Sequence, residues 1–315
     1  LHTIYCSSYL KGCQYINIQF KKTTDGKIVY CIERSKAPIG SGTTEKYTLQ
    51  KELSSKVAYV MENGYPNKSI FGNADKDYYT TGLAIWYVIN PNDSTFEYFN
   101  LANGTYRGNS SAIVVEMAKL VNGANSYSYT SPSIKINNSN SNLSLSSDGK
   151  YYVSSSMGVK TAGTVGNYTV SLSNAPEGTI VTDTKGNAKT TFATNESFLV
   201  KVPVSNVKKI SNEFKVNVSA KGTINKAYAY TSTRSNVQNT GALYPENSNV
   251  NDSTTVKLNV VTVVEISKVD VTTGEELAGA HLELKDEKGN LIEAWVSTNE
   301  SHVIEGLAPG KYTLT

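Results

Sequence analysis

Three cysteines are the first residues that could carry chemistry, and all lie near the start of the chain: Cys6, Cys13 and Cys31. An odd number leaves at least one thiol unpaired or specially used. Cys6 and Cys13 are seven positions apart (13 − 6). They could form a local disulfide, or they could stay as two free buried thiols, and the sequence does not decide between these alternatives. The spacing does not match a zinc site and His2 is the only nearby histidine, so we expect no metal and no cofactor.

Cys31 could also be the nucleophile of a hydrolase, because a thiolate attacks carbonyl carbon atoms readily. Such an enzyme needs a general base beside the thiol, and this base is usually a histidine. The chain has three histidines, His2, His281 and His302, and two of them lie far along the sequence. We therefore expect that the protein is not an enzyme and has no catalytic residues.

Composition narrows the class of protein further. The chain has 315 residues and a formal net charge of +3, and no basic cluster stands out, which argues against nucleic acid as the main partner. No apolar run approaches the ~20 residues of a membrane-spanning helix. No signal peptide opens the chain. The many Ser, Thr and Asn residues, and 21 Tyr against 7 Phe, favour a mature extracellular protein.

The elements that must position Cys31 fall in residues 1–132, which mix strand and helix patterns. Strands are predicted over 16–22 and 27–33, joined by an Asp25-Gly26 turn. Helices are predicted over 48–64, 77–90 and 110–125, with Gly123 ending the last. The second helix contains Gly82, although glycine inside a helix costs about 1 kcal/mol relative to alanine.

The helical period vanishes after about residue 133. Short strands separated by turns predict a β-sandwich over 133–262, interrupted by a polar stretch over 235–253. A third group of strands occupies 263–315, and so short a sandwich buries little surface, so we expect the chain as given to end inside a domain. The fold class is therefore multidomain, with a mixed α/β (α+β) head, a β-sandwich and an incomplete β domain.

The third group resembles the Cna protein B-type, or prealbumin-like, domains of Gram-positive surface proteins and pilins. The matching text is ISKVDVTTGEELAGAHLELKDEKGN followed by GLAPGKYTLT. The resemblance implies that Lys268 is the lysine of an intramolecular isopeptide bond. In that family the lysine bonds to an asparagine or aspartate on the last strand, and a nearby glutamate assists. Both the glutamate and the last strand would fall beyond Thr315, so the bond could not be completed within this chain. The alternative is that Lys268 is an ordinary surface lysine.

The first group resembles the thioester (Thr-Gln-x-Ala) domains at the tips of such adhesins. YCIE (30–33) resembles the family's cysteine strand, and TGLAIW (81–86) resembles its Thr-Gln-x-Ala-Ile-Trp helix. The resemblance implies an internal thioester between Cys31 and a glutamine, which a lysine of a host surface or matrix protein then attacks. The middle segment, GNYTVSLSNAPEGTIVTDTKGNAKTTF, resembles the β-sandwich that often follows.

This sequence departs from the family's helix motif, because Gly82 stands where the glutamine is expected. The other glutamines, Gln14, Gln19, Gln50 and Gln238, lie outside the motif. We therefore expect no thioester in this chain, whether Gly82 is natural or introduced. The resemblance still implies an extracellular adhesin or pilus-tip subunit, followed by stalk or pilin domains and anchored to the cell wall through a downstream sortase signal. A structural pilin or a non-covalent binding protein is the alternative.

Two further features stay open. The middle segment could hold an isopeptide bond, for which the candidates are Lys160 with Asn251 or Asn259, although a plain surface lysine is favoured. Six tyrosines either line a binding surface or fill a small core; they are Tyr65, Tyr78, Tyr79, Tyr87, Tyr98 and Tyr106.

Overall fold

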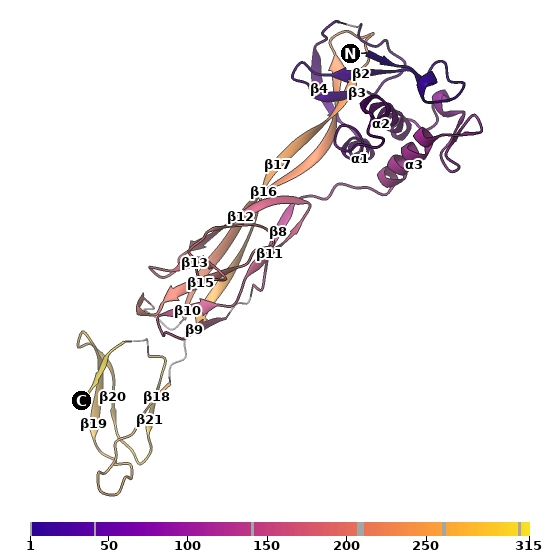
Figure 1. The fold of residues 1–315 in the computed structure, drawn as a ribbon. Coiled ribbons are helices and arrows are strands. Elements are labelled where there is room, and N and C mark those ends of the chain that lie inside the picture. The colour runs from indigo at the N-terminus through magenta and orange to yellow at the C-terminus, as the bar shows by residue number, and fades with distance from the viewer. Residues whose placement is uncertain (1, 41, 140–141, 207–210, 260–262, 308–309) are drawn as a thin grey trace. The chain divides into compact units, whose positions relative to one another are not determined.

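The computed structural model describes residues 2–40, 42–139, 142–206, 211–259, 263–307 and 310–315. The chain forms two compact units (Figure 1). The first unit comprises Leu1–Ser131 and Thr223–Asn247, and the second comprises Pro132–Gly222 and Ser248–Thr315.

The first unit combines short strands with three helices. Its strands are β1 (His2–Ile4), β2 (Ile18–Lys22), β3 (Ile28–Cys31), β4 (Tyr47–Glu52), β5 (Phe99–Asn100), β6 (Thr105–Tyr106) and β7 (Asn109–Ser110). Its helices are α1 (Ser55–Asn63), α2 (Ala74–Ile89) and α3 (Ala112–Asn125), with 3-10 turns at Cys6–Ser8 and Ser94–Phe96. The predicted hairpin at Asp25-Gly26 is confirmed, and Gly26 adopts the left-handed φ of +87° that this turn requires.

Side-chain caps fix the beginnings of two helices. Asn73 accepts a hydrogen bond from the Lys76 amide at the start of α2, and Ser111 accepts one from the Val114 amide at the start of α3. The prediction that Gly123 ends α3 is wrong, because the helix runs to Asn125. A Cβ atom at Gly123 would collide with the Tyr59 hydroxyl group, so this glycine makes room for the Tyr59 ring.

The predicted helix over 48–64 is correct only in its second half. Residues Tyr47–Glu52 form β4, which pairs with β16 (Ser211–Ser232). The residues at helical spacing that are buried, Val57, Val60 and Met61, all lie within α1. Backbone pairing with a strand far along the chain therefore overrides the local helical pattern.

A long hairpin belongs to both units. Strands β16 and β17 (Thr240–Asn259) are neighbours, and the tip of their hairpin, Thr223–Asn247, clusters with the first unit. There β17 pairs with β3 and β16 pairs with β4, which gives the sheet order β1-β2-β3-β17-β16 with β4 on β16. The sequence predicts one continuous sandwich over 133–262 and therefore places this tip in the sandwich, whereas the structure groups it with the first unit.

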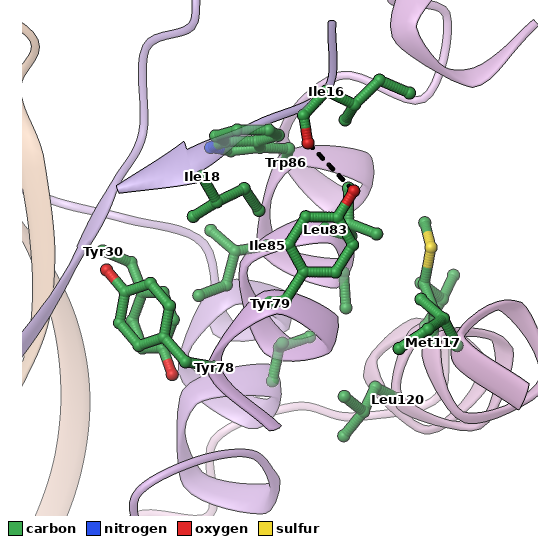
Figure 2. Packing of buried hydrophobic residues seen from close by; sticks show 14 of the residues in the cluster. Ile16, Ile18, Tyr30, Tyr78, Tyr79, Leu83, Ile85, Trp86, Met117 and Leu120 are labelled. Atoms are coloured by element: carbon green, nitrogen blue, oxygen red, sulfur yellow. Dashed lines mark hydrogen bonds between the residues drawn. The ribbon is translucent and has the colours of Figure 1, made fainter. Parts of the chain in front are cut away.

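The core of the first unit lies between this sheet and the helices. Figure 2 shows the Tyr78 ring of α2 stacked on Tyr30 of β3, and the Tyr79 hydroxyl donating to the Ile16 carbonyl at 2.9 Å. Tyr78, Tyr79 and Tyr106 are all buried. These three tyrosines therefore fill the core rather than line a binding surface.

The second unit contains the β-sandwich. Its strands are β8 (Ser133–Asn137), β9 (Leu143–Leu145), β10 (Tyr151–Ser154), β11 (Gly158–Ala162), β12 (Thr164–Ser173), β13 (Ile180–Asp183), β14 (Thr191–Phe192) and β15 (Phe198–Pro203), with a 3-10 turn at Val204–Asn206. One sheet has the order β13-β15-β10-β9, and β12 and β14 extend the sheet of β16 and β17. Alternating apolar residues such as Val200 and Val202 on β15 and Val216 and Val218 on β16 fill the core between them.

The carboxy-terminal segment of the second unit is a small β structure. Its strands are β18 (Val263–Ile266), β19 (His281–Asp286), β20 (Leu291–Val296), β21 (His302–Glu305) and β22 (Tyr312–Leu314). They form the sheet β20-β19-β22 and the pair β18-β21. Leu284, Ile304 and Leu307 are the buried residues of its small core.

Candidate functional site

Cys31 is the last residue of β3, and its thiol faces away from the helices. Tyr30, its neighbour on the same strand, packs against α2 by stacking on Tyr78 with ring centroids 4.5 Å apart. Adjacent side chains on a strand point to opposite faces of the sheet. The Cys31 side chain, which is only 5% exposed, therefore points to the face opposite to α2.

Gly82 lies on the other side of the sheet from this thiol. A Cβ atom at Gly82 would lie 3.1 Å from Ile18 Cδ1 and 3.7 Å from Tyr30 Cδ1, so a side chain there would enter the space between α2 and the sheet. This differs from the expectation that position 82 stands opposite Cys31. The glycine lets α2 approach the sheet closely, which is a reason to accept its cost of about 1 kcal/mol within a helix.

The helix motif does touch Cys31, but through the backbone. The Trp86 Nε1 group donates a hydrogen bond of 2.7 Å to the Cys31 carbonyl oxygen. The Arg34 guanidinium lies over the Trp86 ring, 5.0 Å from its centroid. The aromatic end of TGLAIW therefore holds the end of β3 and does not present an acyl group to the thiol.

A glutamine far along the chain reaches the face that carries Cys31. Gln238, which is 9% exposed, accepts a hydrogen bond of 3.0 Å at Oε1 from the Lys21 ammonium. Lys21 also interacts electrostatically with the Cys31 thiol. One buried ammonium group therefore donates to a side-chain amide carbonyl and acts electrostatically on a thiol, and these are the two groups that a thioester requires.

The hairpin tip places Gln238 by backbone contacts on both sides of it. The Gln238 amide donates to the Ala37 carbonyl at 2.9 Å, and the Ile32 amide donates to the Asn239 carbonyl at 3.1 Å. Thr240, two residues on, lies directly opposite Cys31 in the register between β17 and β3. Residues directly opposite one another share a face of the sheet, so the start of β17 runs beside the thiol.

Tyr47 completes this face. Its hydroxyl donates to the Gln238 carbonyl at 3.2 Å. Burial, together with the charges of Glu45 and Cys31, raises the pKa of Tyr47 to about 12. Tyr47 is therefore a hydrogen-bond donor at neutral pH and not a base.

For both the Cys31 thiol and the Lys21 ammonium, burial shifts the pKa in one direction and the charge of the other group shifts it back. Burial raises the pKa of the Cys31 thiol, and the Lys21 charge opposes that rise. Burial lowers the pKa of Lys21, and the Cys31 charge opposes that fall. The ordinary lysine pKa exceeds that of a thiol, so the two burial effects bring the two values closer together.

A second glutamine shares the face of Lys21. Gln19 stands two residues before Lys21 on β2, and its Nε2 group donates to the Ile39 carbonyl at 2.8 Å. Its Oε1 atom is buried and has no hydrogen-bond partner among the described residues. Gln19 is therefore the natural comparison for Gln238 in any experiment on this site.

The sequence reasoning missed both Lys21 and Gln238. It took Gln238 as part of a polar stretch within the sandwich, although Thr-Gly-Ala-Leu-Tyr (240–244), directly after it, carries the strand residues of β17. A cavity of about 770 Å³ opens on the same face, lined among others by Lys21, Val29, Tyr47 and Thr240.

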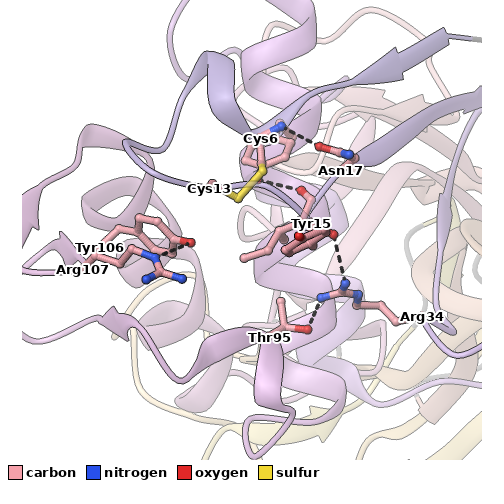
Figure 3. The surroundings of a disulfide bond; sticks show 10 residues. Cys6, Cys13, Tyr15, Asn17, Arg34, Thr95, Tyr106 and Arg107 are labelled. Carbon is pink, nitrogen blue, oxygen red and sulfur yellow. Dashed lines mark hydrogen bonds between the residues drawn. A yellow bond between two sulfur atoms is a disulfide. The ribbon is translucent and has the colours of Figure 1, made fainter.

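The remaining cysteines form a disulfide in the buried core of the first unit. Cys6 and Cys13 are bonded, with their Cα atoms 5.6 Å apart, and the Asn17 side chain accepts a hydrogen bond from the Cys6 amide (Figure 3). No cluster of His, Cys, Asp or Glu in the described part of the chain could hold a metal ion. Of the described helices, none is long and apolar enough to cross a membrane.

The isopeptide candidates lie apart from this site. Lys268 lies just beyond β18 and is exposed. Its backbone amide donates a hydrogen bond of 3.0 Å to the Glu276 carboxylate, and its ammonium forms no ion pair with a described residue. Lys160 on β11 and Asn251 on β17 are both exposed. The side chain of Asn259 lies outside the described residues, so its pairing with Lys160 is untested, and the plain surface lysine favoured from the sequence stays the prediction.

Comparisons with known proteins identify two parts of the chain. Residues 28–126 match the model of the thioester domain family, and residues 262–315 match that of the SpaA prealbumin-like fold domain. The search of curated proteins gave no match.

Two solved structures share the fold. One is the Bacillus anthracis TIE protein, with a TM-score of 0.72 and 24% identity over 97% of this chain; the chain spans 56% of that structure's length. The other is the thioester domain of the Enterococcus faecium TIE86 protein, with a TM-score of 0.53 and 21% identity over 78% of this chain and 87% of that one.

Proposed function

The chain carries a thioester domain and a prealbumin-like domain, and from this premise we propose that it is a surface adhesin or pilus-related protein whose Cys31 thiol and Gln238 amide form an internal thioester. The observation that carries the proposal is the hydrogen bond of 3.0 Å from the Lys21 ammonium to Gln238 Oε1, on the face of the sheet that carries Cys31.

The proposed reaction is acyl transfer in two steps. The Cys31 sulfur attacks the side-chain carbonyl carbon of Gln238 and ammonia leaves, so that a C–S bond replaces a C–N bond. The amine of a lysine on a host surface protein then attacks the same carbon, which releases the thiol and leaves an amide between the two proteins. Because the acyl group is consumed, the protein turns over once and is not an enzyme.

The proposal replaces the expectation that the chain lacks a thioester. That expectation requires position 82 to supply the acyl group, whereas a side chain there would meet Ile18 and Tyr30. The cavity beside Lys21 supports the second step, because it offers an incoming amine an approach to this face of the sheet.

An extracellular location agrees with the first unit's chemistry. Disulfides such as Cys6–Cys13 persist in oxidising compartments and are rare in the cytosol. We propose that the protein acts outside the cell, with its prealbumin-like segment continuing into a stalk that is anchored to the cell wall. A structural pilin or a non-covalent binding protein is the alternative, and it predicts that Cys31 stays a free thiol.

Intact mass measurement tests the thioester. The chain should weigh one ammonia less than its sequence, and methylamine treatment should add one methylamine to that product and expose one thiol. Cys31→Ala and Gln238→Ala should each abolish both effects, whereas Gln19→Ala should leave them unchanged. An isopeptide bond elsewhere would also remove ammonia, but that deficit would persist in Cys31→Ala and resist methylamine.

The result that overturns the proposal is equally specific. A chain of full sequence mass, in which denaturation exposes a Cys31 thiol without prior amine treatment, would favour the non-covalent alternative. If Gln19→Ala lost the mass deficit and Gln238→Ala kept it, Gln19 and not Gln238 would be the residue that supplies the acyl group.

A further inference from the structure

Lys21 is a buried cation without a buried anion to pair with. Its side chain is 1% exposed, yet no ion pair joins it to a described carboxylate, and its ammonium donates to the neutral Gln238 amide. Lysine is almost never fully buried unless it is paired. An apolar residue of similar length would fill this space at lower cost, so packing alone does not account for a lysine here.

Resting on the proposed function, we propose that Lys21 is the catalytic residue of thioester formation: its amine carries the Cys31 proton to the departing nitrogen, and its N–H group stabilises the oxyanion on Gln238. The hydrogen bond to Gln238 supports the second role, and the electrostatic interaction of Lys21 with Cys31 supports the first. The ammonium lies 3.0 Å from Gln238 Oε1, which is the oxygen that gains negative charge when sulfur attacks.

In the proposed step Lys21 accepts one proton and later gives one proton up, so it is unchanged at the end. The neutral amine takes the proton from the Cys31 thiol, and the thiolate attacks the Gln238 carbonyl carbon. The resulting oxyanion accepts a hydrogen bond from the new ammonium. The same ammonium then gives its proton to the amide nitrogen, the C–N bond breaks, and ammonia leaves with Lys21 neutral again. No other reactant is consumed.

The electrostatics of the face support this role. The burial that raises the pKa of Cys31 and lowers that of Lys21 makes proton transfer between them less uphill than it is in water. The hydrogen bond from the thiol to the Glu33 carbonyl and the Arg34 charge both lower the pKa of Cys31, whereas the charge of the Glu33 side chain raises it. Tyr47 stays protonated, since its pKa is raised to about 12, so Lys21 is the group on this face that is suited to carry the proton.

The test follows ammonia loss during refolding. Chains purified in denaturant with Cys31 and Gln238 unreacted are refolded by dilution, quenched in acid at intervals and weighed. Lys21→Met keeps the length of the side chain and removes the amine, and we expect it to slow thioester formation by about 10²-fold or more. Lys22→Met is the matched control, because Lys22 is the next residue, is exposed and points to the opposite face.

A second variant separates catalysis from folding. Lys21→Arg retains a buried cation and a hydrogen-bond donor but cannot give up its proton near neutral pH. We expect it to fold, as judged by a wild-type circular dichroism spectrum, and still to form the thioester slowly. Its rate should lack the rise with pH that the wild type shows as Lys21 becomes neutral.

The outcomes separate the two proposals. If wild type forms the thioester and folded Lys21→Met and Lys21→Arg form it at the same rate, the role of Lys21 is refuted and the proposed function stands. An amide between Lys21 and Gln238, with Cys31 left as a free thiol, would make Lys21 an acyl acceptor and also refute its catalytic role. If wild type forms no thioester, both proposals fail together.

Discussion

Tyr30 and Cys31 are neighbours in sequence, yet Tyr30 packs against α2 while Cys31 points to the other face of the sheet. This alternation separates the helix motif from the thiol. It also means that a residue at position 82 acts on the packing of α2 and not on the chemistry of Cys31.

Gly82→Gln is therefore expected to destabilise the first unit without changing the thioester. The new side chain would begin 3.1 Å from Ile18 Cδ1 in a filled core, and overpacking of this kind costs about 1–3 kcal/mol. Urea unfolding measures the loss, and Gly82→Ala, which adds only the Cβ atom, should lose less. A Gly82→Gln chain that loses a second ammonia would show that position 82 does reach a nucleophile.

The Tyr78 hydroxyl joins β2 to β3 and supports the strand that carries Cys31. It accepts a hydrogen bond from the Lys21 amide at 3.2 Å and donates one to the Val29 carbonyl at 2.7 Å. Lys21 and Val29 lie opposite one another in the β2–β3 register, so Tyr78→Phe removes the hydroxyl's hydrogen bonds without leaving these groups unpaired. The loss should lower the free energy of unfolding by about 0.5–1.5 kcal/mol. Tyr98→Phe is the control, because Tyr98 is half-exposed; equal losses in the two variants would contradict this account.

Reduction of the Cys6–Cys13 disulfide should weaken the first unit. Closing a loop of this length restricts the unfolded chain, and its loss should cost about 2 kcal/mol. Urea unfolding with and without a reductant measures the change, and a Cys6→Ser, Cys13→Ser double variant should match the reduced protein. An unchanged midpoint would mean that the loop is already held by contacts such as that between Asn17 and the Cys6 amide.

Acid should loosen the turn that precedes Gln238. The Glu45 carboxylate accepts hydrogen bonds from Arg234 and Ser232, and these hold its pKa at about 2, below the usual 4.5. A depressed carboxyl pKa stabilises the folded state fully above 4.5, and this contribution is lost as the pH falls towards 2. The protection of the amides of residues 232–239 from hydrogen exchange, taken relative to the intrinsic exchange rate at each pH, should fall over that range in wild type, and Glu45→Gln should show the lower protection already at pH 7.

Much of the secondary structure of the first unit could be predicted from local sequence. The residues that cap α2 and α3 and that form the Asp25-Gly26 turn lie directly beside these elements, and the elements form close to their predicted ranges. The family resemblances of the first and last segments also agree with the matched thioester and prealbumin-like models.

The candidate site depends on pairing that no local pattern encodes. Gln238 and Cys31 are 207 positions apart (238 − 31), and they share a face only because β17 crosses from the second unit to pair with β3. Lys21 looked like one of two ordinary lysines at the end of a strand. Which of Lys21 and Lys22 is buried depends on which face of β2 packs on α2, and that packing is set by tertiary contacts.

In the proposed reaction, the position of Gln238 at the tip of the β16–β17 hairpin would set which part of the chain bears mechanical load. A ligand bonded to the Gln238 carbonyl is tied to the carboxy-terminal segment by residues 239–315 alone. The three helices and the strands before them lie outside that covalent path, so tension on the tether passes along β17 and does not pull through α1, α2 or α3. A link made at position 82 would instead have placed α3 and the whole sandwich in series with the load.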